Sequence, residues 1–195
     1  MAKNSEINMK KLHQFLLSVV VLYSGYATAD TNTDKIRFVQ KMYREQSTQA
    51  HSPRYYDATE RYATGKLAKS HALARKYDQL TTKVLNGDVL DQLCLEGVTQ
   101  MYGGGQDFDL DTPRTYKAEA DGRISVGFKQ YSQVPESSYV TVKYSLAKHN
   151  QSYKVADMEI RLASLVNGGE TKHIRSYADE LQKCTAKQKA EHKLR

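Results

Sequence analysis

Three aspartates that alternate along the chain are the first residues whose spacing suggests chemistry. Asp107, Asp109 and Asp111 follow a run of three glycines, and oxygen ligands at every second position begin a calcium-binding loop. The rest of such a loop requires a glycine and a bidentate glutamate, where this sequence has Thr112 and Ala118. We therefore predict solvated loop carboxylates and no metal, with a calcium site as the alternative.

Tyrosine is the second unusual feature, because the chain has 14 tyrosines and no tryptophan. Tyrosine combines a large apolar ring with a polar hydroxyl and is enriched at protein interfaces. Tyr55, Tyr56, Tyr144 and Tyr153 are the candidates for a ligand-binding pocket or a partner-binding face. Under the alternative interpretation, tyrosines fill the core in place of tryptophan.

The N-terminus has the pattern of a secretory signal peptide. Basic residues precede the apolar run Phe15–Tyr26, and Ala27-Thr28-Ala29 has the form of a cleavage site. This run rises only about 18 Å as a helix, which is short of the roughly 30 Å of a bilayer core. We predict a signal peptide over residues 1–29, a mature chain without a transmembrane span, and a periplasmic or secreted address. A short signal anchor is the alternative.

Cys94 and Cys184 are the only cysteines. Cys184 lies at helical spacing from Ile174, Tyr177 and Leu181, so its sulfur is expected to face the core. An even number of cysteines in an oxidising compartment favours a disulfide. We predict a Cys94–Cys184 bridge, with two buried thiols as the alternative.

Helical periodicity dominates the first part of the mature chain. It predicts a helix over residues 33–49, a longer helical stretch over 55–85 that Gly65 can interrupt, and a short helix over 89–95. In the long stretch, Leu73, Tyr77, Leu80 and Val84 form the apolar face that we expect to be buried. His71 and His149 are expected to face solvent.

After residue 113 the apolar period changes to two, as in strands with one buried face. Alternation predicts four strands near residues 116–120, 124–128, 140–146 and 156–162, and Asp121-Gly122 indicates a tight hairpin between the first two. Gly168-Gly169 then leads into a last helix that includes Ile174. The predicted fold class is α+β: N-terminal helices, a four-stranded antiparallel curved sheet and a closing C-terminal helix.

Charge and composition limit the remaining possibilities. A mean hydropathy of -0.68 excludes a polytopic membrane protein. We predict one domain over residues 30–184 and a basic, frayed tail over 185–195 that could touch an anionic membrane or nucleic acid. The tail has no aromatic residue to stack on a base, which makes nucleic acid an unfavoured partner.

Three segments resemble secreted NTF2-like (cystatin-like α+β) proteins, above all the bacterial envelope group known as DUF3828. They are Ile36–Tyr43, Gln106–Asp111 and Tyr153–Met158. Val155–Leu181 is also similar to the periplasmic phospholipid carriers of the toluene-tolerance (MlaC) type. The resemblance covers most of the mature chain and implies a Gram-negative envelope protein with a pocket between helices and sheet. Tyr153 stands where such families often carry tryptophan.

The resemblance also implies a candidate acid–base pair, because an aspartate and a histidine in the pocket of NTF2-like enzymes can act as a general base. In this sequence the matching candidates are Asp157, on the fourth expected strand, and His173, beside Ile174 at the closing helix. We expect a structural or exposed role for both, with catalysis as the alternative. No motif for a nucleophilic serine or a phosphate loop occurs in the sequence, and no cofactor is expected.

Together these patterns predict a non-catalytic binding protein of the bacterial envelope. Its partner would be a protein, including a toxin if the chain is an immunity protein, or a small apolar ligand held between helices and sheet. The alternatives are a small envelope hydrolase or isomerase that uses Asp157 and His173, and a phospholipid shuttle.

Overall fold

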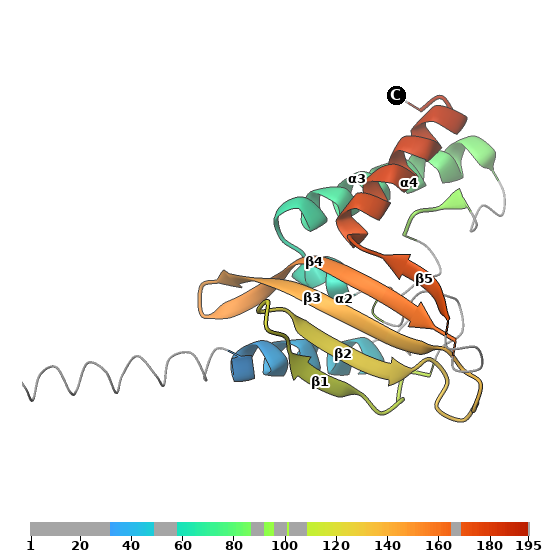
Figure 1. The fold of residues 1–195 in the computed structure, drawn as a ribbon. Coiled ribbons are helices and arrows are strands. Elements are labelled where there is room, and N and C mark those ends of the chain that lie inside the picture. Colours follow the sequence, from blue (N-terminus) through green and yellow to red (C-terminus); the bar gives the residue numbers. More distant parts are fainter. Residues whose placement is uncertain are drawn as a thin grey trace, which may run out of the picture.

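The computed structural model describes residues 32–48, 58–86, 92–95, 101, 109–164 and 169–194 of the 195-residue chain. A helix over residues 32–48 comes first (Figure 1). The later helices are α2 (Ala58–Tyr62), α3 (Gly65–Leu85) and α4 (Tyr177–Glu191). Between α3 and α4 lie the strands β1 (Thr115–Ala118), β2 (Ile124–Lys129), β3 (Tyr139–His149), β4 (Ser152–Ala163) and β5 (Glu170–Ile174).

The sheet is an antiparallel meander in the order β1-β2-β3-β4-β5. The α+β class is confirmed, but the sheet has five strands where we predicted four. The additional strand, β5, contains Ile174, which we predicted to lie in the last helix. Its signal is weak because only Ile174 of its five residues is buried. The hairpin at Asp121-Gly122 is confirmed, although Glu119 pairs with Arg123 and the loop is therefore residues 120–122, not the two residues predicted. Gly122 has φ of 81°, and its N–H donates to the carbonyl of Glu119.

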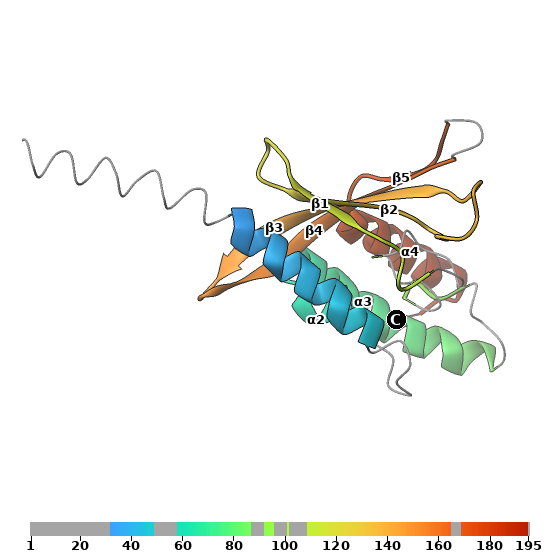
Figure 2. The same ribbon diagram turned by 90° about the horizontal axis from the view of Figure 1, so that it is seen from below.

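The described helices all lie on one face of the sheet, and none of them covers the other face, which we call the uncovered face (Figures 1 and 2). Alternate residues of the three central strands point toward the helices and form the core with the helix over residues 32–48. The buried members include Val39, Met42, Tyr43, Val126, Phe128, Val142, Tyr144, Met158 and Ile160. The interior between this helix and the sheet is therefore occupied by side chains.

A β-bulge in β4 sets which residues reach the uncovered face. Ser145 of β3 pairs with Asp157 whereas Leu146 pairs with Val155, so Ala156 has no partner in the register. Beyond the bulge, Met158 and Ile160 are buried in the core. The residues that alternate with them, Glu159 and Arg161, consequently point to the uncovered face.

The predicted buried face of α3 is only partly correct. Tyr77 is buried, but Leu73 is 43% exposed and Val84 is 56% exposed. The buried side of α3 is instead largely polar and includes Ser70, His71, Ala74, Tyr77, Asp78 and Thr81. Hydropathy could not find this side because α3 packs against α4 through hydrogen bonds: the carboxylate of Asp78 accepts from Gln188 Nε2 at 2.7 Å. His71 is therefore buried, contrary to prediction, whereas His149 is exposed as predicted.

The predicted disulfide is confirmed: Cys94 and Cys184 are bonded, with their Cα atoms 5.8 Å apart. Helix α4 continues past Cys184 to Glu191, where we predicted a frayed tail from Thr185. It continues because Thr185 and Gln188 are buried against the rest of the fold. The predicted signal peptide lies outside the described residues, and within those residues no helix has the length and apolarity needed to cross a bilayer.

Candidate functional site

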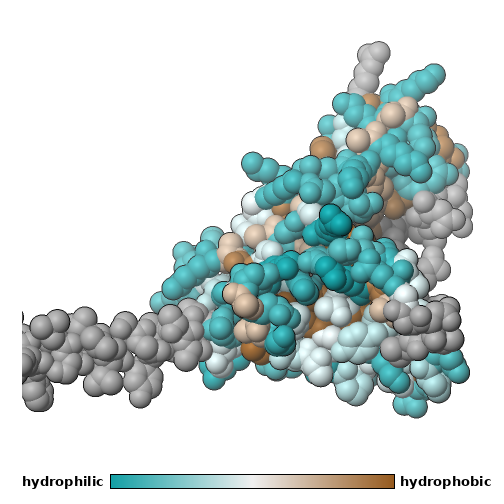
Figure 3. Space-filling view, in the orientation of Figure 1, coloured by the Kyte–Doolittle hydropathy of each residue, from teal (hydrophilic) through white to brown (hydrophobic). Residues whose placement is uncertain are grey.

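The uncovered face of the sheet carries a compact group of charged side chains centred on Glu159. Arg161 lies two residues further along β4 and is paired in register with His173 of β5. Arg123 comes from the turn before β2. We call Arg123, Glu159, Arg161 and His173 the Glu159 cluster. In the view onto this face, hydrophilic residues cover the middle of the sheet (Figure 3).

Both oxygens of the Glu159 carboxylate are occupied. Oε2 accepts from Arg123 at 2.6 Å, and Oε1 accepts from Arg161 Nε at 2.7 Å and lies 3.0 Å from His173 Nε2. Glu159 is only 8% exposed although it points to the uncovered face. Burial disfavours its charge, but the three partners outweigh burial and lower the pKa of Glu159 to about 2. The carboxylate is thus held ionised.

A second layer of contacts holds the cluster in place. Arg123 also donates to Asp121 at 2.7 Å through its side chain, and its backbone N–H donates to the same carboxylate. His173 Nδ1 lies 3.4 Å from a carboxylate oxygen of Glu170. Each ring nitrogen of His173 therefore faces a carboxylate. This arrangement fixes two guanidinium groups on an open surface and leaves neither imidazole nitrogen directed at a substrate.

A pocket of about 760 Å³ lies at one end of the sheet. Its lining includes Thr115, Gly127 and Tyr139. A Cβ at position 127 would overlap the hydroxyl of Tyr139 and lie 3.1 Å from Thr115 Oγ1. Glycine is thus required there for Tyr139 to lie close against the sheet.

The three aspartates of the alternative calcium site do not form a metal site in the described part of the chain. Asp107 lies outside it. The carboxylate of Asp109 accepts from the hydroxyl of Ser132 and from the N–H of Asp111. The Ser132 hydrogen bond is the main cause of the lowered pKa of Asp109. No group of three or more candidate ligands for a metal occurs among the described residues. Asp109 therefore connects two loops.

Asp157 and His173 do not meet as an acid–base pair. Asp157 Oδ1 accepts from the N–H groups of Met158 and Ala178 at 2.8 and 3.0 Å, and its Oδ2 accepts from Ser176 Oγ at 2.5 Å. Asp157 thus fastens the start of α4 to β4. His173 lies on β5, not at the closing helix, and its partner is Glu159.

The predicted tyrosine surface is divided by the fold. Tyr144 is fully buried, and its hydroxyl donates to Tyr43 Oη at 3.1 Å. Tyr153 is half-buried, with its ring centroid 6.2 Å from that of Phe38. Tyr55 and Tyr56 lie outside the described residues.

Sequence reasoning did not identify the Glu159 cluster. The available signal was the alternation of Asp157, Glu159 and Arg161 on the polar side of a predicted strand.

Comparison with protein-family models, with curated proteins and with solved structures finds no match for this chain.

Proposed function

We propose that this chain is an extracytoplasmic binding protein that performs no chemistry and engages a protein partner through the uncovered face of its sheet. The observation that carries the proposal is the Glu159 cluster, whose charged side chains are held rigidly on an open surface. Side chains that are already ordered lose less entropy on binding. Arginine and tyrosine are also the residues that most often dominate binding energy at interfaces.

The proposal also includes a location outside the cytoplasm and membership of the NTF2-like proteins. The Cys94–Cys184 disulfide is typical of oxidising compartments, and the N-terminal sequence pattern agrees with export. The order of helices, antiparallel sheet and closing helix supports a relationship to the NTF2-like proteins and to the DUF3828 group. A toxin bound by an immunity protein is one partner that this proposal includes.

The geometry favours binding over the hydrolase or isomerase alternative. A general base needs a free acceptor atom within reach of the substrate proton. Both ring nitrogens of His173 face carboxylates. The carboxylate of Asp157 is engaged by three donors at the start of α4.

The interior favours a surface partner over an apolar ligand or a phospholipid shuttle. The ring centroid of Tyr43 lies 6.1 Å from that of Phe128 and 6.3 Å from that of Tyr144. These edge-to-face contacts fill space that an acyl chain would require.

The test is site-specific photo-crosslinking in the cells that make the protein. A photo-reactive residue replaces Tyr139, which is 36% exposed beside the pocket, and a matched control replaces the exposed Gln182 on α4. We expect one discrete protein adduct from position 139, its loss in the Arg161→Ala background, and no such adduct from position 182. Equal labelling at both positions, or catalytic turnover that Asp157→Asn abolishes in a folded protein, would overturn the proposal.

A further inference from the structure

Helix α3 carries a stripe of lysines and apolar residues on the side that faces away from the core. Steps of four and three residues place its members along one side of the helix. We define the α3 stripe as Lys69, Leu73, Lys76, Leu80, Lys83 and Val84. The buried residues of α3, from Leu67 to Thr81, lie on a different side.

All members of the stripe except the half-buried Leu80 are exposed, and the charge of the stripe is of one sign. Leu73 and Val84 are two of the most exposed large apolar side chains among the described residues, at 43% and 56%. Lys69, Lys76 and Lys83 are exposed and form no ion pair within the described part of the chain. The only acidic residue of α3 is Asp78, which is buried. The surface therefore combines uncompensated positive charge with accessible apolar area.

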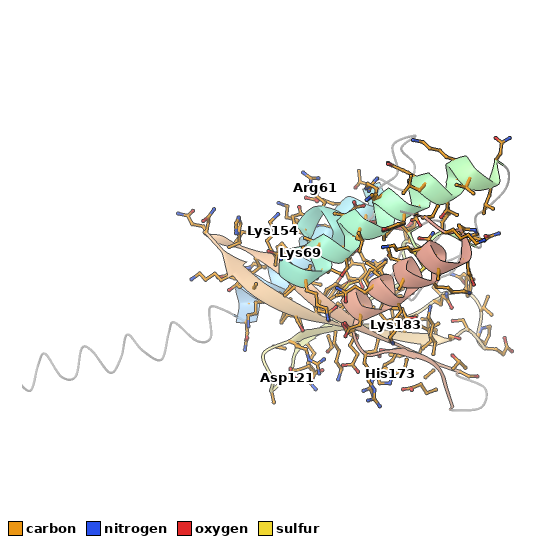
Figure 4. All side chains as sticks on the ribbon, turned by 90° about the horizontal axis from the view of Figure 1, so that it is seen from above. Arg61, Lys69, Asp121, Lys154, His173 and Lys183 are labelled. Carbon is orange, nitrogen blue, oxygen red and sulfur yellow. A yellow bond between two sulfur atoms is a disulfide. The ribbon has the colours of Figure 1, made fainter. Side chains whose placement is uncertain are left out.

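Two more cations lie near the N-terminal end of the stripe. Arg61 of α2 and Lys154 of β4 both approach the ring of Tyr62, at 5.7 and 5.6 Å from its centroid. Figure 4 shows Arg61, Lys69 and Lys154 on the side of the molecule away from His173 and Asp121. The basic end of the stripe and the Glu159 cluster thus face different directions.

We propose that the α3 stripe docks the protein on an anionic phospholipid surface. Lysines beside apolar residues on one helix are suited to an interface, because the ammonium groups reach the headgroups while leucine and valine enter the acyl boundary. A helix of 21 residues presents a ridge about 30 Å long, which matches a flat surface better than a compact epitope. The net charge, +7 for the full chain and 7 − 2 = +5 without residues 1–29, agrees with attraction to anionic lipid. This binding goes beyond the proposed function and leaves the uncovered sheet face for the partner.

The absence of tryptophan makes the test direct, because a single introduced tryptophan is the only one to report. Leu73→Trp places it in the stripe, and Val134→Trp places it at an equally exposed site outside the stripe, since the native side chains are 43% and 44% exposed. Both variants are made in the full chain, so any contribution of the N-terminal segment is common to them. Circular dichroism verifies their folds, and Val84→Trp provides a second reporter in the stripe.

With vesicles that contain phosphatidylglycerol, we expect the emission of Leu73→Trp to shift to shorter wavelength and to be quenched by brominated acyl chains. Vesicles of phosphatidylcholine alone should give neither effect, and Val134→Trp should not respond. The triple change Lys69→Gln/Lys76→Gln/Lys83→Gln should raise the lipid concentration needed for half the shift on the order of 100-fold. The charge-matched control Lys129→Gln/Lys172→Gln/Lys189→Gln should raise it less than about tenfold.

Three results would overturn the proposal: no shift with phosphatidylglycerol, equal shifts from the two tryptophan sites, or equal losses in the two triple variants. A stripe that responds to poly-glutamate but not to vesicles would also overturn it and would assign the stripe to an acidic protein. The crosslinking at position 139 does not depend on these fluorescence measurements. Either the proposed function or the lipid contact can therefore be disproved while the other stands.

Discussion

Glu159 and His71 are both buried and titratable, but their surroundings differ completely. Glu159 is 8% exposed and has hydrogen-bond partners on both carboxylate oxygens. His71 is 2% exposed in the interface between α3 and α4, and neither of its ring nitrogens has a hydrogen-bond partner among the described residues. Its ring instead meets the ring of Tyr177, with centroids 5.5 Å apart.

The pKa of each group is lowered, for opposite reasons. Burial raises the pKa of Glu159, and the hydrogen bonds of Arg123, Arg161 and His173 outweigh it. Burial lowers the pKa of His71 to about 4, only partly opposed by the charge of Glu60. One group is held charged by its partners, whereas the other is held neutral by burial. The direction of a pKa shift therefore indicates a functional site only when the hydrogen-bond partners of the group are also known.

Removal of the disulfide should have the largest effect on stability. It should also distinguish the α3–α4 interface, which holds His71, from the sheet, which holds Glu159. A crosslink that closes about 90 residues stabilises a fold by roughly 4–5 kcal/mol in the loop-entropy model. We expect Cys94→Ala/Cys184→Ala to lower the free energy of unfolding by about 4 kcal/mol, as measured in urea. Hydrogen exchange should accelerate more in α3 and α4 than in β3 and β4, because the bridge holds α4. Uniform acceleration would contradict this difference.

His71 should make the fold sensitive to mild acid. Its pKa in the folded state, about 4, lies below its ordinary value of 6.5, so between these values the unfolded chain binds a proton that the folded chain does not. This contribution to stability is complete above pH 6.5 and is lost as the pH falls toward 4. The loss should be about 3 kcal/mol.

Urea unfolding at pH 7 and pH 4.5 measures this loss. His71→Leu should remove most of the dependence without lowering stability at pH 7, because no hydrogen bond is broken. His149→Leu, at an exposed turn, is the matched control and should change neither value. If the free energies of unfolding of the two histidine variants depend on pH in the same way, His71 is not a buried, neutral side chain in the folded protein.

Glu159 should make stability depend on pH in a lower range than His71 does. Its pKa in the folded state, about 2, lies below its ordinary value of 4.5, so its contribution is complete above pH 4.5 and is lost as the pH falls toward 2. With allowance for the exposure of the two arginines, we expect a loss of about 2 kcal/mol. Glu159→Gln should show this loss already at pH 7, whereas Glu136→Gln in an exposed loop should not.

The double variant His71→Leu/Glu159→Gln tests whether the two groups are independent. We expect the stability changes of the two single variants to add at each pH, because the groups share no partner. A chemical-denaturation series from pH 7 to pH 3 would reveal coupling as a departure from additivity.

The contrast also shows what the sequence could predict. The antiparallel strands, the Asp121-Gly122 turn and the disulfide all follow from local periodicity, turn chemistry or cysteine number, and the structure contains them. These features depend on residues near one another in sequence, or on the only two cysteines present.

The errors arise where polar residues are buried. The buried side of α3 carries Ser70, His71, Asp78 and Thr81, so hydropathy assigned the core to Leu73 and Val84 instead. The Glu159 cluster was missed because Arg123, Glu159 and His173 come from a turn and two strands. Only the register of β4 with β5, and the bulge that sets the facing of β4, bring them together.

The smallest effect is expected at Ser176, which lies between the two regions. Its side chain accepts from the N–H of Asp179 as the N-cap of α4 and donates to Asp157 of β4. Ser176→Ala should lower the free energy of unfolding by about 1 kcal/mol, as loss of an N-cap does. The pH ranges over which His71 and Glu159 lose their contributions to stability should not change, because Ser176 contacts neither residue in the described hydrogen bonds. Ser176→Asp keeps an acceptor for the N-cap but places a second carboxylate beside Asp157, so it should be less stable than Ser176→Asn. A Ser176→Ala protein that lost its acid response at His71 would show instead that the position of α4 governs that response.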